Sequence, residues 1–206
     1  MSAYEAALRR RSASKVTDAA PDRAELVRLI EAAGRVADHS NLQPWRLIEL
    51  RGEDRVRLGR AIHKADGHDG VSTKPLRAPL LIAVVFSEKP SGKVPAWEQE
   101  AVASGVAHML SLLLDEAGWG VIWRTGGYTR SKAVAKAHGL RSGEQLLGWL
   151  YVGGKPDERL RTRRPIDAAS FLSSMPTGSG GAIAKAATPA KSSKKCKKKK
   201  KKSKKK

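Results

Sequence analysis

Cysteine is almost absent from this sequence, and the common nucleophile and nucleotide-binding fingerprints do not occur in it. Cys196 is the only cysteine, so the chain can form no intramolecular disulfide and no multi-cysteine metal site. The histidines show no metal-ligand spacing with one another, which argues against a metal site. No Gly-x-Ser-x-Gly or Cys/His arrangement offers a covalent nucleophile, and the glycine-rich segments match neither the dinucleotide fingerprint nor a P-loop. The sequence therefore favours neither a disulfide scaffold nor a zinc fold.

Long apolar runs are also missing. Residues 101–114 form the longest strongly apolar stretch, and this stretch is too short and too interrupted to span a bilayer. The first five residues, Met-Ser-Ala-Tyr-Glu, lack the apolar core of a signal peptide. We therefore expect a cytoplasmic protein that is not transmembrane.

Acidic residues are absent from residues 185–206, which carry thirteen lysines and so supply most of the formal net charge of +20. Such a run of like charges repels itself and buries nothing. We expect residues 177–206 to be a disordered lysine-rich tail, and residues 1–176 to form one domain. The tail could bind nucleic acid or another anionic surface without sequence specificity, which would associate the protein with the nucleoid or with lipid; a tail that is merely solvated is the alternative.

Helical and strand-like patterns alternate through the first domain, with no internal repeat. Apolar spacings of three and four predict helices over residues 3–10, 22–37, 54–65, 97–117 and 131–138, and short apolar runs predict strands over 45–50, 78–86, 118–124 and 146–152. The fourth helix is apolar nearly all round, which is typical of a helix buried in a large core or in a subunit interface. Residues 164–174 have a weak pattern and are interpreted as an arm on a partner. The alternation predicts an α+β or α/β layered domain.

Two segments near the N terminus carry side chains suited to a ligand. Arg10, Arg11 and Ser12 lie at the end of the first predicted helix, and guanidinium groups with a hydroxyl suit phosphate oxygens; a basic helix end that complements the helix dipole is the alternative. Residues 38–45 (Asp-His-Ser-Asn-Leu-Gln-Pro-Trp) follow a predicted helix and precede a strand. Their amides can donate and accept toward a planar heterocycle, whereas an Asx-rich turn is the plainer interpretation.

A third segment, residues 118–127, ends in two glycines after a short strand. Glycine lets backbone N–H groups approach a ligand closely, and Arg124 and Thr125 add a cation and a hydroxyl; an ordinary glycine-rich turn is the alternative. Glu98 and Glu100 are two residues apart on a helix and do not share a face. We therefore predict no catalytic acid–base pair.

Taken together, the three segments resemble the nitroreductase family of flavin enzymes, over about residues 3–175. The resemblance rests on Arg10-Arg11-Ser12, on Ser40-Asn41-Leu42-Gln43-Pro44-Trp45, on the long central helix, on Trp123-Arg124-Thr125-Gly126 and on the strand from Gly148 to Gly153. Within the family the sequence is most similar to the short bacterial NAD(P)H nitroreductases.

The resemblance implies a nitroreductase-like α+β fold: a mixed or antiparallel sheet flanked by helices, in a homodimer whose long buried helix lies at the interface. It also implies FMN as the cofactor, NADH or NADPH as the electron donor and no metal. The cofactor-binding residues it implies are Arg10, Arg11, Ser12, Trp123, Arg124 and Thr125 of one subunit with Arg35 and His39 of the other, and Asn41 and Gln43 in the loop near the flavin.

The function that follows from the resemblance is FMN-dependent NAD(P)H oxidation with reduction of a nitroaromatic, quinone or similar small acceptor in two half-reactions. No catalytic side chain is needed, because the cofactor carries the chemistry. Two alternatives stay open. The same fold can host other flavin chemistry, such as dehalogenation or ring fragmentation, or the protein can act chiefly as a nucleic-acid or anionic-surface binder through its tail.

Overall fold

The computed structural model describes residues 2–157 and 165–175. The chain divides into two compact units, Met1–Arg159 and Leu160–Lys206. The described part of the second unit contains one short 3-10 helix, Ala168–Phe171, with exposed side chains. The expected lysine-rich tail, 177–206, lies outside the described residues and stays a prediction.

The first unit contains four strands in one antiparallel sheet of order β1-β2-β4-β3. The strands are β1 (Trp45–Leu50), β2 (Leu80–Ser87), β3 (Trp119–Arg124) and β4 (Glu144–Gly154). Strand β2 is almost wholly buried and lies at the centre, which confirms the interpretation of its continuous apolar run. Strands β1 and β3 are the two edges of the sheet.

Five α-helices accompany the sheet in the described part of this unit: α1 (Ala3–Arg9), α2 (Arg23–Ala33), α3 (Glu53–Ala65), α4 (Ala96–Glu116) and α5 (Lys132–Ala137). Short 3-10 helices occur at His39–Asn41 (η1), Lys74–Arg77 (η2) and Gly127–Arg130 (η3). Helix α1 begins with a reciprocal capping box between Ser2 and Glu5, the pairing that satisfies two free N–H groups at a helix start.

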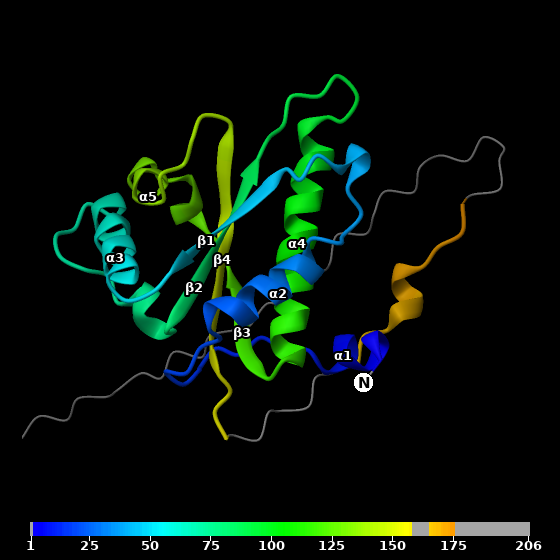
Figure 1. Ribbon diagram of the computed structural model, residues 1–206, viewed down its shortest axis with the longest axis horizontal. Helices are drawn as coiled ribbons and strands as arrows, with labels where there is room; N and C mark the ends of the chain where they lie inside the picture. The colour runs from blue at the N-terminus through cyan, green and yellow to red at the C-terminus, as the bar shows by residue number, and fades with distance from the viewer. Residues whose placement is uncertain (1, 158–164, 176–206) are drawn as a thin grey trace, which may run out of the picture. The chain divides into compact units, whose positions relative to one another are not determined.

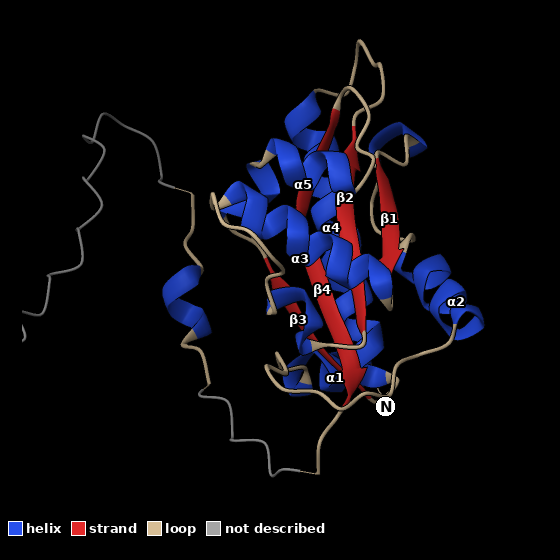
Figure 2. Cartoon of the chain, turned by 90° about the vertical axis from the view of Figure 1, so that its left-hand side faces the viewer, coloured by secondary structure: helices blue, strands red, loops and turns tan. Residues whose placement is uncertain are grey.

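Helices cover both faces of the sheet (Figures 1 and 2). Helices α2 and α4 pack on one face, in a core that includes Leu26, Leu110 and Val121. Helices α3 and α5 pack on the other, in a core that includes Leu58, Val134 and Trp149. The period of two along a strand sends successive side chains to opposite faces, so the two cores share the same four strands. The predicted α+β layered fold is confirmed.

Helix α2 ends earlier than the sequence pattern predicted, at Ala33 instead of residue 37. Gly34 caps it, and a Cβ built at this glycine would lie 3.1 Å from Cζ2 of Trp45. The Trp45 ring therefore packs tightly against Gly34, where a larger residue would require the ring to shift, and the chain leaves the helix to begin the loop 35–44.

The N-terminal segment after α1 runs along the β3 side of the sheet. Ser12 forms a parallel bridge with Val121 of β3, and Thr17 an antiparallel bridge with Gly154 of β4. A Cβ at Gly153 would lie 2.7 Å from the Thr17 carbonyl oxygen, closer than real Cβ atoms approach such an atom. The glycine at this position thus allows the first ligand-binding candidates to lie against β3.

Helix α4 is buried on one side only. Val102, Val106 and Leu110 are at most 8% exposed, whereas Trp97 is 72% exposed and Met109 37%. Ala101 and His108 also face outward. Residues 2–157 therefore leave a largely apolar stripe of this helix uncovered, which agrees with its sequence being apolar nearly all round.

Candidate functional site

Three cations line a pocket of about 370 Å³ at the end of β3: Lys74, Arg77 and Arg124. The pocket lies on the α3 and α5 face, and aromatic residues of that face complete its walls (Tyr128, Trp149 and Tyr151). Trp123, Arg124 and Thr125 all contribute to the lining, so the third predicted segment is at this pocket. Positive charge with flat apolar walls suits a planar, anionic ligand.

Two buried nitrogen atoms of this segment have no hydrogen-bond partner among the described residues. They are Nε1 of Trp123 and Nε of Arg124. The Trp123 ring packs edge-on against His108, with ring centroids 4.9 Å apart, and the Arg124 guanidinium lies 5.4 Å from the centroid of Tyr151. Buried donors are normally satisfied. The Trp123 ring packs in the α2 and α4 core, whereas Arg124 lies over Tyr151 on the α3 and α5 face, so of the two atoms only Nε of Arg124 is on the pocket's side of the sheet.

Tyr151 adds a nearly buried phenol to the same pocket, with 6% exposure. Burial raises the pKa of Tyr151, and the charges of Arg124 and Arg77 oppose this shift in part. The phenol therefore stays protonated at neutral pH and is available as a hydrogen-bond donor.

The first predicted segment adjoins this region. The N–H of Ala13 donates to the Val121 carbonyl at 2.9 Å, two residues before Trp123 on β3. Arg10 and Arg11 are half-buried, and Ser12 is exposed. The structure therefore brings Arg10, Arg11 and Ser12 to the strand that carries Trp123, Arg124 and Thr125, as the order of motifs suggested.

The second segment, residues 38–45, is a tightly organised loop. The Asp38 carboxylate accepts hydrogen bonds from the N–H groups of Leu42 at 3.2 Å and Gln43 at 2.7 Å. Three of its residues have left-handed backbone angles: Ser40 (φ 64°), Asn41 (φ 50°) and Gln43 (φ 49°). Such angles are costly for residues other than glycine and tend to occur at functional sites.

A second pocket, of about 500 Å³, lies beside this loop. Arg35, Asn41, Gln43 and Trp45 line it, together with the end of α2. His39 points elsewhere: its Nδ1 lies 2.6 Å from Oε1 of Glu98 at the start of α4. The loop thus presents amides, a guanidinium and a paired imidazole close to the exposed end of α4.

The two groups of predicted residues do not meet within one chain. Arg35, His39, Asn41 and Gln43 lie at the β1 edge, and Arg10 to Ser12 with Trp123 to Thr125 lie at the β3 edge, with β2 and β4 between them. A single site that uses both groups would need two copies of the chain.

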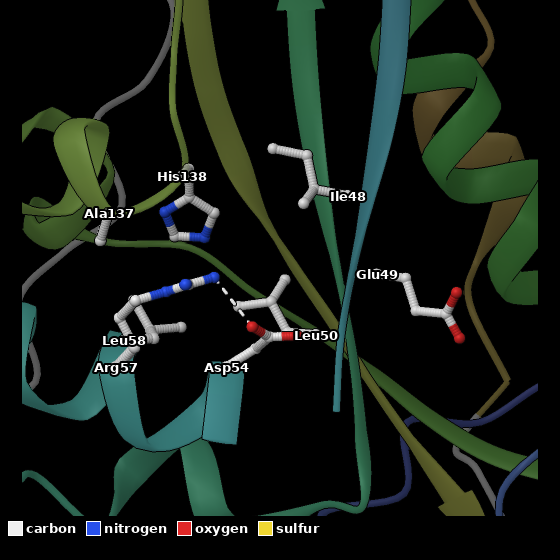
Figure 3. A pocket seen from close by; sticks show the side chains of 8 residues that line it. All are labelled: Ile48, Glu49, Leu50, Asp54, Arg57, Leu58, Ala137 and His138. Carbon is white, nitrogen blue, oxygen red and sulfur yellow. Dashed lines mark hydrogen bonds and ion pairs between the residues drawn. The ribbon is translucent and has the colours of Figure 1, made fainter. Parts of the chain in front are cut away.

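A smaller pocket, of about 80 Å³, lies between β1, α3 and α5 (Figure 3). It is lined by side chains that include Leu50, Asp54, Arg57 and His138. None of the residues predicted for ligand binding takes part, so this pocket belongs to the core packing on that face.

Metal binding finds no support in residues 2–157 and 165–175, where no group of three or more His, Cys, Asp or Glu side chains could hold an ion. Over the same residues no helix is long and apolar enough to cross a membrane.

The fold and the pocket define an α+β protein with an antiparallel sheet between two helical layers and a cationic, aromatic ligand pocket at one edge strand. Comparison with known proteins specifies the family. The model of the nitroreductase family matches residues 7–66 and 66–154, and the chain belongs to this family.

Two bacterial relatives illustrate the similarity in sequence. The protein named "Putative NAD(P)H nitroreductase YdjA" of Escherichia coli strain K12 is 35% identical over 161 residues, which cover 74% of this chain and 88% of that protein. A protein of Haemophilus influenzae named "Putative NAD(P)H nitroreductase" is 29% identical over 172 residues, which cover 79% of this chain and 94% of that protein.

Solved structures agree on the fold. A nitroreductase-like family protein from Bacillus cereus matches with a TM-score of 0.73 at 22% identity, covering 85% of this chain and 96% of that one. NfnB of a sphigopyxis strain, described as an FMN and NADPH-dependent nitroreductase, matches with a TM-score of 0.67 at 20% identity, covering 86% and 100% of the two chains.

Reasoning from the sequence missed four residues of the cationic pocket: Lys74, Arg77, Tyr128 and Tyr151. A signal for the first two was present, because they directly precede the apolar run that forms the central strand. The tyrosines gave no comparable signal, since Tyr151 lies within a core strand and Tyr128 in a turn.

Proposed function

We propose that this protein is an FMN-dependent NAD(P)H oxidoreductase that reduces nitroaromatic, quinone or similar small acceptors in two half-reactions. The observation that carries the proposal is the cationic pocket formed by Trp123, Arg124 and Thr125 beside Arg10, Arg11 and Ser12. Family membership supports the same activity, and the names of the relatives support a reduced pyridine nucleotide as donor.

The donor set fits FMN. Its phosphate is a multiply charged anion, for which the guanidinium groups of Arg10 and Arg11 and the hydroxyl of Ser12 are suitable partners. The buried Nε of Arg124 has no partner among the described residues and can donate to an acceptor atom of a flavin ring. When bound, FMN supplies the redox chemistry, accepting reducing equivalents from NADH or NADPH and passing them to the acceptor.

The protein's own contribution is positioning and electrostatics. A reduced flavin carries negative charge on its pyrimidine side, and preorganised cations stabilise charge that develops in a site from which water is largely excluded. Lys74, Arg77 and Arg124 are the cations of the pocket and are assigned this role. No acid–base side chain is required.

The functional unit is proposed to be a homodimer with two such sites. The uncovered stripe of α4, with Trp97 and Met109 exposed, supports a self-association surface. Association there would let Arg35, His39, Asn41 and Gln43 of one copy approach the pocket of the other. The left-handed loop angles are consistent with a loop built to hold a ligand.

A second function is proposed for the tail. Its thirteen lysines suit nonspecific, salt-sensitive binding to nucleic acid or another anionic surface, which would place a cytoplasmic enzyme at the nucleoid or at lipid. Other flavin chemistry, such as dehalogenation or ring fragmentation, remains the rival within the same fold.

The deciding experiment is spectroscopic. Purified protein titrated with FMN is expected to show the spectrum of a bound flavin, with absorbance at about 450 nm. It is also expected to oxidise NADH or NADPH when an acceptor is supplied. A chain that takes up no FMN and oxidises neither nucleotide would contradict the proposal. Product analysis after anaerobic reduction would separate nitro or quinone reduction from dehalogenation.

A further inference from the structure

Lys74 is held at the edge of the cationic pocket by a hydrogen-bond chain that leads to a carboxylate. Its ammonium donates to the hydroxyl of Tyr128, and that hydroxyl donates to Oδ2 of Asp66 at 2.7 Å. Nζ of Lys74 also lies 4.5 Å from the centroid of the Tyr128 ring. Tyr128 therefore contacts the same ammonium with both its hydroxyl and its ring.

The three residues come from three different elements, each fixed by backbone hydrogen bonds. Lys74 begins η2, and Asp66 caps the end of α3, where its N–H donates to the carbonyls of Ile62 and His63 at 3.1 and 3.0 Å. Tyr128 lies in η3, and its carbonyl accepts a hydrogen bond from the N–H of Ser131 at 3.1 Å. The two hydrogen bonds thus link η2, η3 and the end of α3.

The hydrogen bond to Tyr128 restricts the side chain of Lys74, which is otherwise exposed. A lysine ammonium is a compact charge on a flexible stem, and ordering that stem costs side-chain entropy. The Tyr128 hydroxyl engages one of the three ammonium donors, and two remain for a ligand. The carboxylate of Asp66 accepts the hydrogen bond of the phenolic O–H, which turns the oxygen lone pairs of Tyr128 toward Lys74.

We infer that Tyr128 is a positioning residue that holds the Lys74 ammonium where it stabilises the reduced, anionic cofactor more than the oxidised one. The inference rests on the proposed function, because it assigns a redox-tuning role within that site. A charge fixed before the ligand arrives needs no reorganisation when negative charge develops.

The test compares binding of oxidised and reduced FMN to the wild type and to Tyr128→Phe. The substitution keeps the ring, its packing and the cation–π contact, and it removes only the hydroxyl. We expect affinity for reduced FMN to fall relative to oxidised FMN by about threefold to tenfold, the range of one hydrogen bond. A tenfold change corresponds to about 30 mV for a two-electron couple, so the midpoint potential of the bound flavin falls. Tyr4→Phe, at an exposed residue of α1, is the matched control and leaves the ratio unchanged.

A double-mutant cycle shows whether the effect passes through Lys74. In a Lys74→Ala background, Tyr128→Phe is expected to cause no further change in the ratio of the two affinities. A full Tyr128→Phe effect in that background would overturn the inference, because the hydroxyl would then act on the cofactor without Lys74.

A measurement without cofactor completes the test. NMR order parameters of the Lys74 side chain are expected to fall in cofactor-free Tyr128→Phe and to stay unchanged in Tyr4→Phe. Unchanged order in Tyr128→Phe would overturn the inference. A wild-type chain that binds no FMN would overturn the proposed function and the inference together, whereas a chain that binds FMN with the same affinity ratio in Tyr128→Phe would overturn the inference alone.

Discussion

Trp149 donates its indole N–H to Nε2 of His138 at 3.0 Å, and Nδ1 of the same imidazole lies 2.8 Å from the Val134 carbonyl. Because Nε2 accepts, Nδ1 carries the proton and donates to Val134, so the imidazole is held neutral in one tautomer. Trp149 also lines the cationic pocket. The core between β4 and α5 therefore fixes the orientation of a ring that forms a wall of the proposed site.

The neutral state of His138 makes stability depend on pH. Burial lowers the pKa of His138 below its ordinary value of 6.5, so the unfolded chain binds the proton more readily than the folded chain. The contribution to stability is complete above about pH 6.5 and is lost as the pH falls below that value toward the folded pKa. Chemical denaturation at pH 7.5 and pH 5 is expected to show a larger loss for the wild type than for His138→Gln. An equal loss in both would contradict this assignment.

A second pH-dependent contribution comes from Arg46 and Glu144. Nε and a terminal nitrogen of Arg46 each donate a hydrogen bond to the Glu144 carboxylate at 2.6 Å. The Glu144 side chain is only 2% exposed. Hydrogen bonding from Arg46 lowers the pKa of Glu144 from its ordinary value of 4.5 to about 2. The stability that this pair contributes is thus present above pH 4.5 and is lost as the pH falls toward 2.

Removal of Arg46 takes the main counter-charge from Glu144, which keeps the hydrogen bond from the N–H of Arg141 at 2.8 Å. We expect Arg46→Ala to lower the free energy of unfolding by about 1.5–3 kcal/mol at neutral pH, the range of hydrogen bonds to a charged group. Arg57→Ala is the control, since its ion pair with Asp54 is 63% and 43% exposed and contributes about 0–1 kcal/mol. Urea denaturation measures both, and similar losses in the two variants would contradict the prediction.

The sequence predicted most elements because their apolar patterns are strong. The run that forms β2 and the long helix α4 were placed to within two residues at each end. The short 3-10 helices η1, η2 and η3 were missed, since three or four residues carry no periodicity. The end of α2 was placed four residues late, because the packing of the Trp45 ring against Gly34 is a tertiary contact that the local pattern does not contain.

The candidate site could be proposed from the sequence where its residues are consecutive in the chain, and its residues stay a prediction. The motifs around Arg10 and Arg124 were recognised as motifs, and the structure brings them to the same edge strand. Tyr128 is far from both Lys74 and Asp66 in sequence, and the three side chains meet through hydrogen bonds. No local sequence pattern predicts this arrangement. The residues of a second chain that would complete the site also stay a prediction, because no local sequence pattern specifies them.

The role of Arg10 can be separated from its neighbour. Arg10→Ala is expected to weaken FMN binding by about tenfold to a hundredfold, the range of a hydrogen bond to a charged group, with little change in melting temperature. Arg9→Ala, at an exposed residue of the same helix end, is the control and leaves FMN affinity unchanged. Fluorescence titration with FMN measures both, and an unaltered affinity in Arg10→Ala would count against the assignment of the phosphate site.

Gly148 is the residue of β4 that allows Trp123 and Arg124 to pack closely. A Cβ at this position would lie 2.5 Å from Nε1 of Trp123 and 2.6 Å from the Arg124 carbonyl oxygen, and the backbone φ is +154°. We expect Gly148→Ala to lower stability by about 1–3 kcal/mol through crowding and strain and to weaken FMN binding by displacing both side chains.

The control for this change is Gly92→Ala, at a position where a Cβ would meet no atom within 4 Å. Its melting temperature and FMN affinity are expected to match the wild type. If Gly148→Ala behaved like Gly92→Ala, the close packing of β4 against the third segment would be wrong.

The lysine-rich tail and the oxidoreductase are expected to be separable. All thirteen lysines of the tail lie in residues 185–206, and their binding to a polyanion releases counterions, so retention on DNA or anionic vesicles falls steeply with salt. Deletion of residues 178–206 is expected to abolish that retention and to leave flavin content and turnover unchanged. A full-length variant with the tail lysines replaced by serine separates charge from length and is expected to behave like the deletion. Loss of flavin in either variant would contradict this prediction, because it would mean that the tail contributes to cofactor binding.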